Sequence, residues 1–403
     1  MPDCAHNCGD AIAFRQPTPT MQITLFFVCA CATMYSYFGY PLVLQLLPRA
    51  RRLAARTAAA PSPVTTLPRM ALIITAHNEA GRIARKLDNT LAIDYPRELL
   101  QVIVASDCSD DSTDDIVRSF AQHGVTLVRA EVRLGKENAQ GCAITAARAD
   151  ILVFSDVATE IPANGLRQIA AAFAQSPDIG AVSSEDRFLS EGGKLVGEGA
   201  YVRYEMWLRR LESERAGLVG MSGSFFAARR RVCAEWDIHA PSDFNTALNC
   251  ARHGMVAVSS PDVLGFYRDV QDPALEYRRK LRTVLRGITA IARHPEVLRP
   301  GFGTFAFQVW SHKIMRWLVP WLLIATLALN AALTGTHWFF GLTLLGQIAF
   351  YAIALGAHLV PTLREPLVPR LIYFFVQVNV AIAHATVQFL RGRRMSVWAP
   401  TAR

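Results

Sequence analysis

Residues 71–79 read ALIITAHNE, a continuous apolar run that ends in a polar tip. Residues 102–111 (VIVASDCSDD) and 151–156 (ILVFSD) repeat this pattern. Short apolar runs of this kind are typical of strands that are buried on both faces of a parallel sheet. Open α/β sheets bind ligands outside the carboxyl ends of their strands, so we expect the acidic side chains at these tips to share one rim. They are Glu79, Asp107 and Asp156.

Helix and strand signals alternate over the rest of this region. One helix face is predicted from the spacing of Leu166, Ile169, Ala170 and Phe173. A second helix is predicted from Ser112, which opens a capping-box pattern, to Gly124. Further strands are expected at residues 125–128, 180–183 and 255–258. Alternating strands and helices predict βαβ units and therefore an α/β fold with a mainly parallel sheet.

Hydrophobic residues make up 51% of the 403 residues, and many of them are concentrated in long runs. The first run covers residues 22–47, and three more cover 314–333, 338–359 and 371–390. Because about 20 apolar residues suffice for a helix to cross a bilayer, the sequence predicts a membrane protein. The first run is too long for a cleaved signal peptide and is expected to remain as an anchor. Met21 is an alternative start, which the sequence leaves open.

The formal charge is +9, from 42 basic and 33 acidic residues. Arginines crowd the end of the first run, at Arg49, Arg51, Arg52 and Arg56, whereas Arg15 alone precedes it. By the positive-inside rule, we expect a multi-pass protein of the cytoplasmic (inner) membrane with the large middle region in the cytoplasm and the amino terminus outside. The position of these arginines favours anionic lipid headgroups of the bilayer as partners, and not nucleic acid.

The carboxyl end presents a conflict. Three late crossings would put it outside, yet Arg391, Arg393 and Arg394 favour the cytoplasm. The alternative is that the last run lines a cavity or lies in the interface, because it carries polar residues. These are Gln377, Asn379, His384 and Gln388.

These signals together predict the organisation of the chain. The eight cysteines add nothing to it, because they show no disulfide or zinc spacing. We expect an amino-terminal tail (1–20), a transmembrane anchor (21–48), a linker (49–68), a catalytic domain (69–300), an interfacial helix (301–313), a region of about three transmembrane helices (314–390) and a basic tail (391–403).

Three segments of the soluble region are similar to motifs of the inverting family 2 glycosyltransferases. Residues 75–79 (TAHNE) resemble the Pro-x-(aromatic or His)-Asn-Glu motif, and residues 93–96 (IDYP) resemble the Asp-Tyr-Pro that follows it. Residues 106–113 (SDCSDDST) parallel the segment Asp-Asp-Gly-Ser-Thr-Asp-Gly-Thr. Residues from about 70 to 287 resemble in particular the cellulose-synthase-like membrane branch.

The resemblance implies an A-type glycosyltransferase fold, which is Rossmann-like, and a nucleotide-sugar donor. It implies donor contacts from His77, Glu79 and Asp107. Carboxylates suit this role because they accept hydrogen bonds from ribose hydroxyls or a pyrimidine N–H. Lys136, in a segment similar to the Gly-Lys segment of the family, is implied to lie near the donor as well.

Asp156 stands where the family carries Asp-x-Asp, the motif that binds a metal on the diphosphate. The resemblance therefore implies a divalent metal, Mg²⁺ or Mn²⁺, with Asp156 as donor-binding residue and metal ligand. Ala158 replaces the second carboxylate. Either Asp156 serves together with water and phosphate oxygens, or metal dependence is weakened.

Asp243 aligns with the Glu-Asp or Asp-Asp motif of the family, whose aspartate is the catalytic base. A sugar hydroxyl needs such a base because it is a poor nucleophile until a carboxylate accepts its proton. Ser242 replaces the usual preceding acid, and the alternative is that Asp243 is a helix N-cap before Ala247 and Leu248. Residues 220–226 resemble the glycine-containing segment on the acceptor side, which implies Ser222 and Gly223; a tight structural turn is the alternative.

Residues 279–283 (RKLRT) stand at the position of the Gln-x-x-Arg-Trp motif. Arg282 retains the arginine of the motif, and Arg279 shares its helix face, so both are candidates for the diphosphate. A lipid-facing patch is the alternative. Thr283 replaces the tryptophan that helps to hold a growing acceptor in the relatives, which favours single sugar transfer over processive synthesis.

The resemblance implies a membrane-bound hexosyltransferase that inverts the anomeric carbon. The donor is expected to be a nucleotide-sugar, a UDP-sugar above others, and the acceptor a lipid-linked or growing glycan in polysaccharide or cell-envelope biosynthesis. Polysaccharide export proteins are candidate partners. Two alternatives stay open: a polyprenyl-phosphate glycosyltransferase, and a non-catalytic subunit for nucleotide-sugar binding or export, which the departures at Ala158, Ser242 and Thr283 favour.

Overall fold

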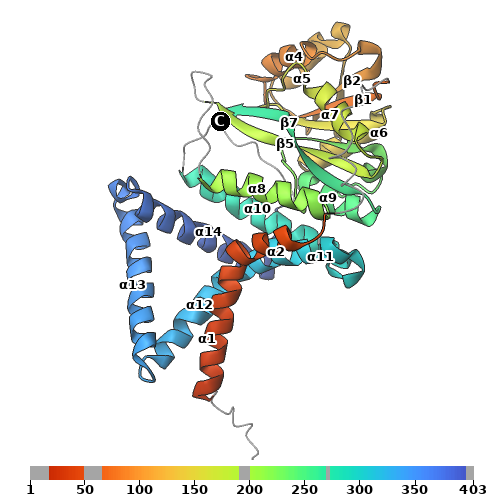
Figure 1. Ribbon diagram of the computed structural model, residues 1–403. Coiled ribbons are helices and arrows are strands. Elements are labelled where there is room, and N and C mark those ends of the chain that lie inside the picture. The colour runs from red at the N-terminus through yellow and green to blue at the C-terminus, as the bar shows by residue number, and fades with distance from the viewer. Residues whose placement is uncertain (1–17, 50–65, 190–199, 269–272, 396–403) are drawn as a thin grey trace, which may run out of the picture. The chain divides into compact units, whose positions relative to one another are not determined.

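The computed structural model of the protein describes residues 18–49, 66–189, 200–268 and 273–395 (Figure 1). Most of the expected amino-terminal tail, most of the linker with Arg51, Arg52 and Arg56, and the end of the basic tail lie outside the described residues. The chain forms two compact units. One comprises Met1–Tyr35 with Leu318–Val376, and the other Ser36–Trp317 with Gln377–Arg403.

The larger unit contains a seven-stranded sheet with the strand order β3-β2-β1-β4-β6-β5-β7. Its strands are β1 (Met70–Ala76), β2 (Leu100–Ser106), β3 (Val125–Arg129), β4 (Ile151–Asp156), β5 (Ile179–Leu189), β6 (Phe225–Arg229) and β7 (Val256–Arg268). Strands β1 to β4 pair in parallel, as do β5 and β7, whereas β6 runs antiparallel to β4 and β5. The mainly parallel α/β sheet predicted from the sequence is confirmed.

The three strands with polar tips are neighbours in the sheet, with β1 between β2 and β4. Ala76 lies opposite Ser106, and Thr75 opposite Asp156, so the three strands end at one edge. The order of the strands reverses at β1, and the crevice at such a switch point is where open α/β sheets bind ligands. The sheet therefore brings the acidic tips to one rim, as expected.

Helices cover both faces of the sheet because successive strand residues alternate between them. The helices of the chain are α1 (Pro19–Met34), α2 (Tyr40–Leu46), α4 (Ile83–Leu91), α5 (Thr113–Ser119), α6 (Lys136–Ala146), α7 (Gly165–Ala174), α8 (Ala200–Arg215), α9 (Ser242–Arg252), α10 (Pro273–Arg293), α11 (Gly303–Val309), α12 (Met315–Leu333), α13 (Trp338–Leu359) and α14 (Leu367–Leu390). α4, α5 and α7 pack on one face, against Leu72 and Ile74 of β1. α6 and α9 pack on the other, against Ala71 and Ile73.

The sequence signals miss three features of this domain. Nothing in them predicts β6, whose place depends on pairing with β4, where the rings of Phe154 and Phe226 stack at 4.8 Å. β5 and β7 continue past their predicted ends, because Glu185–Leu189 of β5 pair with Leu264–Arg268 of β7. The capping box does not form: Ser112 makes no side-chain cap, since its ψ of 8° is not extended, and Asp111 Oδ1 accepts from the Thr113 N–H at 2.9 Å.

Four helical stretches in the described part of the chain are long and apolar enough to cross a membrane. They are Pro19–Leu46, Pro300–Leu333, Trp338–Leu359 and Leu367–Leu390, in agreement with the four apolar runs. The first two each contain a π-helical turn, at Tyr35–Gly39 and Trp310–Ile314. In the second, Gly303, with a φ of 54°, separates the 3-10 turn Pro300–Phe302 from α11, and the interfacial role of residues 301–313 stays a prediction.

Two contacts within the larger unit join helices from distant parts of the sequence. The Tyr40 hydroxyl of α2 donates to Glu212 Oε1 of α8 at 2.6 Å, and both side chains are fully buried. The Tyr277 hydroxyl of α10 lies 3.1 Å from His384 Nδ1 of α14. The last residues of α14 therefore lie beside a helix of the unit that holds the sheet.

Close packing around β5 gives a test of this fold. A Cβ on Gly180 would lie 2.8 Å from Cys250 Sγ and 2.9 Å from Met255 Cβ, so Gly180→Ala is expected to destabilise the protein by about 1–3 kcal/mol through overpacking. Gly301→Ala is the matched control, because its added Cβ meets nothing within 4 Å. Thermal unfolding in detergent measures both variants, and equal melting temperatures would contradict the described packing of β5.

Candidate functional site

Side-chain hydrogen bonds join the loops that follow β1 and β2. The Asn78 side chain donates to Asp110 Oδ1 at 2.5 Å and accepts from the Asp110 N–H at 3.0 Å, and the Glu79 N–H donates to Thr113 Oγ1 at 2.8 Å. Asn78 and Cys108 both have left-handed backbone conformations, with φ of 53° and 54°. Non-glycine residues adopt this conformation at a cost, which the cross-loop bonds offset.

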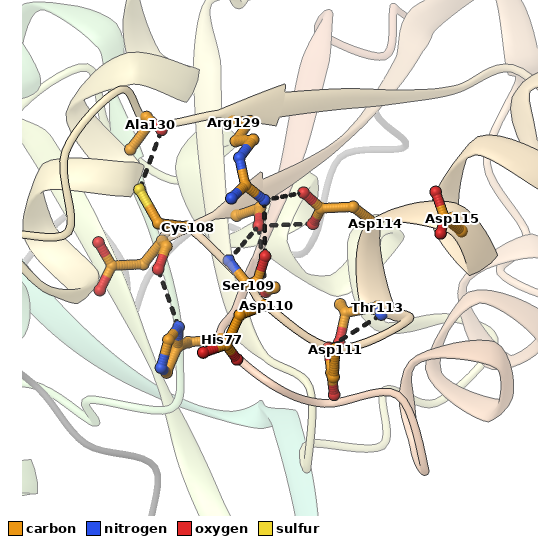
Figure 2. A network of polar contacts seen from close by, with 12 residues as sticks. His77, Cys108, Ser109, Asp110, Asp111, Thr113, Asp114, Asp115, Arg129 and Ala130 are labelled. Atoms are coloured by element: carbon orange, nitrogen blue, oxygen red, sulfur yellow. Dashed lines mark hydrogen bonds and ion pairs between the residues drawn. The ribbon is translucent and has the colours of Figure 1, made fainter.

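Acidic side chains in the loop after β2 and in the first turn of α5 stabilise that loop (Figure 2). Asp114 pairs with Arg129 and accepts from Ser106 Oγ at 2.6 Å. Arg129 also donates to the Ser109 carbonyl at 2.8 Å. These partners occupy Asp114, and Asp111 accepts from the Ala80 and Thr113 N–H groups at 3.1 and 2.9 Å, so both carboxylates support the loop.

The structure brings the three expected donor residues of this edge together. His77 Nδ1 lies 2.8 Å from the Asp107 carbonyl oxygen. Asp107 is fully buried, and its Oδ1 accepts from the Gly135 N–H at 3.1 Å. Its Oδ2 has no hydrogen-bond partner among the described residues. A buried carboxylate oxygen in this state is costly, and a ligand N–H or hydroxyl would satisfy it. Glu79, also buried, lies 3.4 Å from Arg82.

Lys136 links the donor side of the site to the expected acceptor segment. It is the first residue of α6, its side chain is 8% exposed, and its Nζ lies 2.5 Å from Asp156 Oδ1. The same Nζ donates to the Gly223 carbonyl at 2.7 Å. The Asp156 N–H in turn donates to the Ser224 carbonyl at 2.9 Å. The end of β4 and the segment before β6 are therefore fixed to one another.

Asp243 lies next to that segment, in the first turn of α9. A Cβ on Gly223 would be 3.1 Å from Asp243 Oδ2, so the absence of a side chain at this position keeps the carboxylate accessible. Burial raises the pKa of Asp243, and the positive charges of Lys136 and Arg286 oppose the rise. The structure thus places the expected base, Lys136 and Gly223 in one small region.

Glu137 belongs to the same cluster, although the sequence patterns do not indicate it. Its side chain is 2% exposed, and its Oε1 lies 2.6 Å from the Arg286 guanidinium. The Ser242 N–H donates to the same oxygen at 3.3 Å. The adjacency of Glu137 to Lys136 is the signal that could have found it. Glu137 supplies a carboxylate beside the Asp243 turn, where Ser242 replaces the usual acid.

The two arginines expected to bind the diphosphate, Arg279 and Arg282, lie on α10. Burial and the neighbouring Arg286 and Arg279 lower the pKa of Arg282, whereas Asp156 and Glu137 act in the opposite direction. Arg282 is therefore within electrostatic reach of the Asp156 carboxylate, and Arg279 and Arg286 are its positive neighbours. Such a group suits a diphosphate, because guanidinium groups bind phosphate oxygens in bidentate geometry.

Ser222 faces a carboxylate that the sequence analysis missed. Its hydroxyl donates to Asp186 Oδ1 at 2.7 Å, and Tyr267 donates to the same oxygen at 3.2 Å. Burial raises the pKa of Asp186, and Arg209 together with the hydroxyl donors opposes the rise. Acidic residues within β5 were the available signal, of the kind that marked the other three strands. Ser222 is engaged with the Asp186 carboxylate, whereas Gly223 lies against Asp243.

The residues present offer a divalent metal a small ligand set. Among the described residues, no group of three or more His, Cys, Asp and Glu side chains could hold a metal ion. Asp156 is the carboxylate at the expected position, and its Oδ1 is paired with Lys136. One carboxylate is enough where substrate phosphates and water complete the octahedron, as is usual for Mg²⁺. The residues therefore fit a metal that arrives with a diphosphate, not one held by the protein alone.

The sheet order, the switch point at β1 and the acidic rim together define an A-type glycosyltransferase fold. Residues 71–236 match the family described as Glycosyl transferase family 2, and this part of the chain is a family 2 glycosyltransferase domain. The resemblance to family 2 glycosyltransferases is confirmed, and the cellulose-synthase-like branch stays a prediction.

Curated relatives match parts of the chain. The beta-monoglucosyldiacylglycerol synthase of Synechocystis sp. is 25% identical over 174 residues, which cover 41% of this chain and 36% of that protein. The probable glycosyltransferase YdaM of Bacillus subtilis is 39% identical over 56 residues, or 14% of this chain and 13% of its own. The chain thus spans about a third or less of the length of these two relatives.

A solved structure resembles nearly the whole chain. The mannosyltransferase PcManGT from Pyrobaculum calidifontis, in complex with GDP-Man and Mn²⁺, superposes with a TM-score of 0.69 at 23% identity. The alignment covers 93% of this chain and 99% of that one. At this identity the likeness establishes the shared fold.

The contact between Gly223 and Asp243 gives a test of the site. Gly223→Ala would bring a methyl group to 3.1 Å from the carboxylate, so we expect sugar transfer to fall between about 10-fold and 100-fold through misplacement of that group. Binding of the donor nucleotide, measured by calorimetry, is expected to stay within twofold of the original, because Glu79 and Asp107 are untouched. Unchanged transfer would remove Gly223 from the reaction region.

Proposed function

We propose that this protein is a membrane-bound inverting glycosyltransferase that moves a sugar from a nucleotide-sugar, with a UDP-sugar as the first candidate, to a lipid-linked or growing glycan. The observation that carries the proposal is the position of Lys136. Its ammonium group joins Asp156, on the donor side, to the Gly223 carbonyl, and Gly223 lies against Asp243. One side chain therefore connects the residues suited to the diphosphate with the residue suited to act as base.

The nucleoside would be bound between the β1 and β2 loops. Glu79 and the unpartnered Oδ2 of Asp107 are acceptors for ribose hydroxyls or a base N–H. The cross-loop bonds of Asn78 hold these acceptors in place before the donor binds, which reduces the ordering cost of binding. PcManGT was solved with GDP-Man, so a GDP-sugar is the second donor to consider.

In the proposed reaction, Asp243 accepts the proton of the acceptor hydroxyl as its oxygen attacks the anomeric carbon. The bond to the diphosphate oxygen breaks on the opposite face of the sugar, so the anomeric configuration inverts. Negative charge then develops on the leaving diphosphate, near Lys136 and Arg282. These cations stabilise it most effectively because they are positioned before the reaction starts.

A divalent cation is proposed to accompany the donor, with Asp156 as its protein ligand. When bound, it would neutralise charge on the diphosphate as a Lewis acid. The Mn²⁺ in PcManGT supports this choice of ion class. Lys136 would keep its bond to the Gly223 carbonyl, and the Asp156 carboxylate would serve both Lys136 and the cation.

A lipid acceptor is supported by the helices and by a relative. The four membrane-length helices would hold the domain at a bilayer surface. The relative in Synechocystis is named for a glucosylated diacylglycerol, so a diacylglycerol hydroxyl is a second candidate acceptor beside a glycan. Polyprenyl phosphate remains a third, and it differs chemically because the attacking group is a phosphate oxygen that needs no strong base. Export proteins are proposed as partners only if the product is a polymer.

We propose the cytoplasmic face of the inner membrane as the location, from the arginines after the first apolar run. The contact between Tyr277 and His384 supports the alternative for the last helix, in which its end lies beside the catalytic unit at the interface. Arg391, Arg393 and Arg394 would then stay in the cytoplasm, which removes the charge conflict.

A donor screen in nanodiscs tests the proposed function. Purified protein is expected to release UDP from one of UDP-glucose, UDP-galactose and UDP-GlcNAc, or GDP from GDP-mannose, in the presence of Mn²⁺ and membrane lipid extract. Asp243→Asn should lower this turnover by about 100-fold to 10,000-fold while nucleotide binding persists, because only the base is lost. Nucleotide binding without turnover under all these conditions would favour a non-catalytic subunit.

The environment of Asp243 predicts the pH dependence of transfer. A base must be ionised to accept a proton, and burial raises the pKa of Asp243. We therefore expect kcat/KM to fall with decreasing pH at values above the usual carboxyl range of about 4. Arg286→Met removes a cation that stabilises the ionised form, so it should move this acid limb to higher pH. A limb that stays in place in Arg286→Met would argue against Asp243 as the titrating group.

A further inference from the structure

Lys86 reaches the donor loop from α4, on the opposite side from Lys136. Its side chain is buried, with 3% of the residue exposed. Its Nζ donates to Ser155 Oγ at 2.8 Å and to the Thr159 carbonyl at 2.5 Å. These acceptors bracket Asp156, since one precedes it directly and the other follows it by three residues. Lys86 therefore spans the turn that presents the Asp156 carboxylate.

Other bonds close the same turn without the help of a second carboxylate. The Thr159 N–H donates to the Asp156 carbonyl at 3.2 Å, and Thr159 Oγ1 donates to the Ser224 carbonyl at 3.2 Å. Ala158, at the tip of the turn, contributes no oxygen ligand from its side chain. Because this turn presents a single carboxylate for a metal, its geometry depends on bonds of this kind, and the buried Lys86 supplies two of them.

The burial of Lys86 is costly and thus needs an explanation. Lysine is almost never fully buried unless it is paired, because its ammonium group loses its hydration. Burial lowers the pKa of Lys86 to about 7, against the attraction of Asp156 and Glu160. Both the charged and the neutral form carry N–H groups that can donate to Ser155 and Thr159. An apolar side chain would fill the same space in the core without this cost.

We propose that Lys86 is a positioning residue that holds the turn of residues 155–159, and with it the Asp156 carboxylate, in the geometry that the donor diphosphate requires. This inference rests on the proposed function, because it assigns the cation of the donor diphosphate to Asp156. Lys86 touches neither donor nor acceptor in this scheme; it acts through the Ser155 hydroxyl and the Thr159 carbonyl.

The test is Lys86→Met, which keeps an unbranched side chain and removes the ammonium group. We expect the affinity for Mn²⁺–UDP or Mn²⁺–GDP, measured by calorimetry on the full chain in nanodiscs, to fall between about 10-fold and 100-fold, as for other groups that orient a ligating residue. The KM for the donor should rise by a similar factor, while the KM for the acceptor stays within twofold. Arg85→Met is the matched control, because Arg85 is the exposed neighbour that pairs with Glu160 at the surface.

Ser155→Ala is the second variant, because it removes one acceptor of Lys86 without a change in charge. It should lower nucleotide affinity in the same direction and by a smaller factor, even if Lys86→Met proves too unstable to purify. A purely structural role would lower the melting temperature of both variants but leave nucleotide affinity and donor KM of the folded protein unchanged. That result would overturn the inference.

The binding measurement separates this inference from the proposed function. If the unaltered protein binds neither UDP nor GDP, the proposed function fails. If it binds one of them, and Lys86→Met and Ser155→Ala bind that nucleotide equally well, the positioning role of Lys86 fails alone.

Discussion

The ion pair between Lys136 and Asp156 is the contact on which the arrangement of the site depends. A buried charge pair is costly to form, and the loss of either partner leaves an uncompensated charge, so such a pair resists change. Lys136 begins α6 directly after Gly135, whose φ of 107° suits glycine and whose N–H binds Asp107. The donor loop of β2, the end of β4 and the Gly223 segment are thereby positioned together.

The carboxylates around this pair differ in their surroundings and therefore in the roles they can take. Asp243 lies near Lys136 and Arg286, beside a glycine that leaves it room, which suits a group that gains and loses a proton. Asp186 is held by hydroxyl donors from Ser222 and Tyr267, which suits a fixed structural group. Environment, not residue type, assigns such roles in active sites.

Asp156 is held from both faces of the sheet. Lys136 approaches from α6, and Lys86 approaches the backbone of the same turn from α4. Helices on opposite faces of a parallel sheet reach the same strand end, so two distant sequence positions can orient one carboxylate. The turn after β4 thus owes its shape to the fold around it, and the chain can carry alanine at position 158.

The sequence by itself determined the parallel strands, the acidic rim and the four apolar helices, because apolar runs, polar tips and run length are local properties of the chain. Its motifs also identified Lys136, Asp156 and Asp243 as candidates. Only the tertiary structure decided the antiparallel β6, the pairing of Lys136 with Asp156, and the roles of Glu137, Asp186 and Lys86. These depend on contacts between residues tens of positions apart, for which neither spacing nor composition leaves a signal.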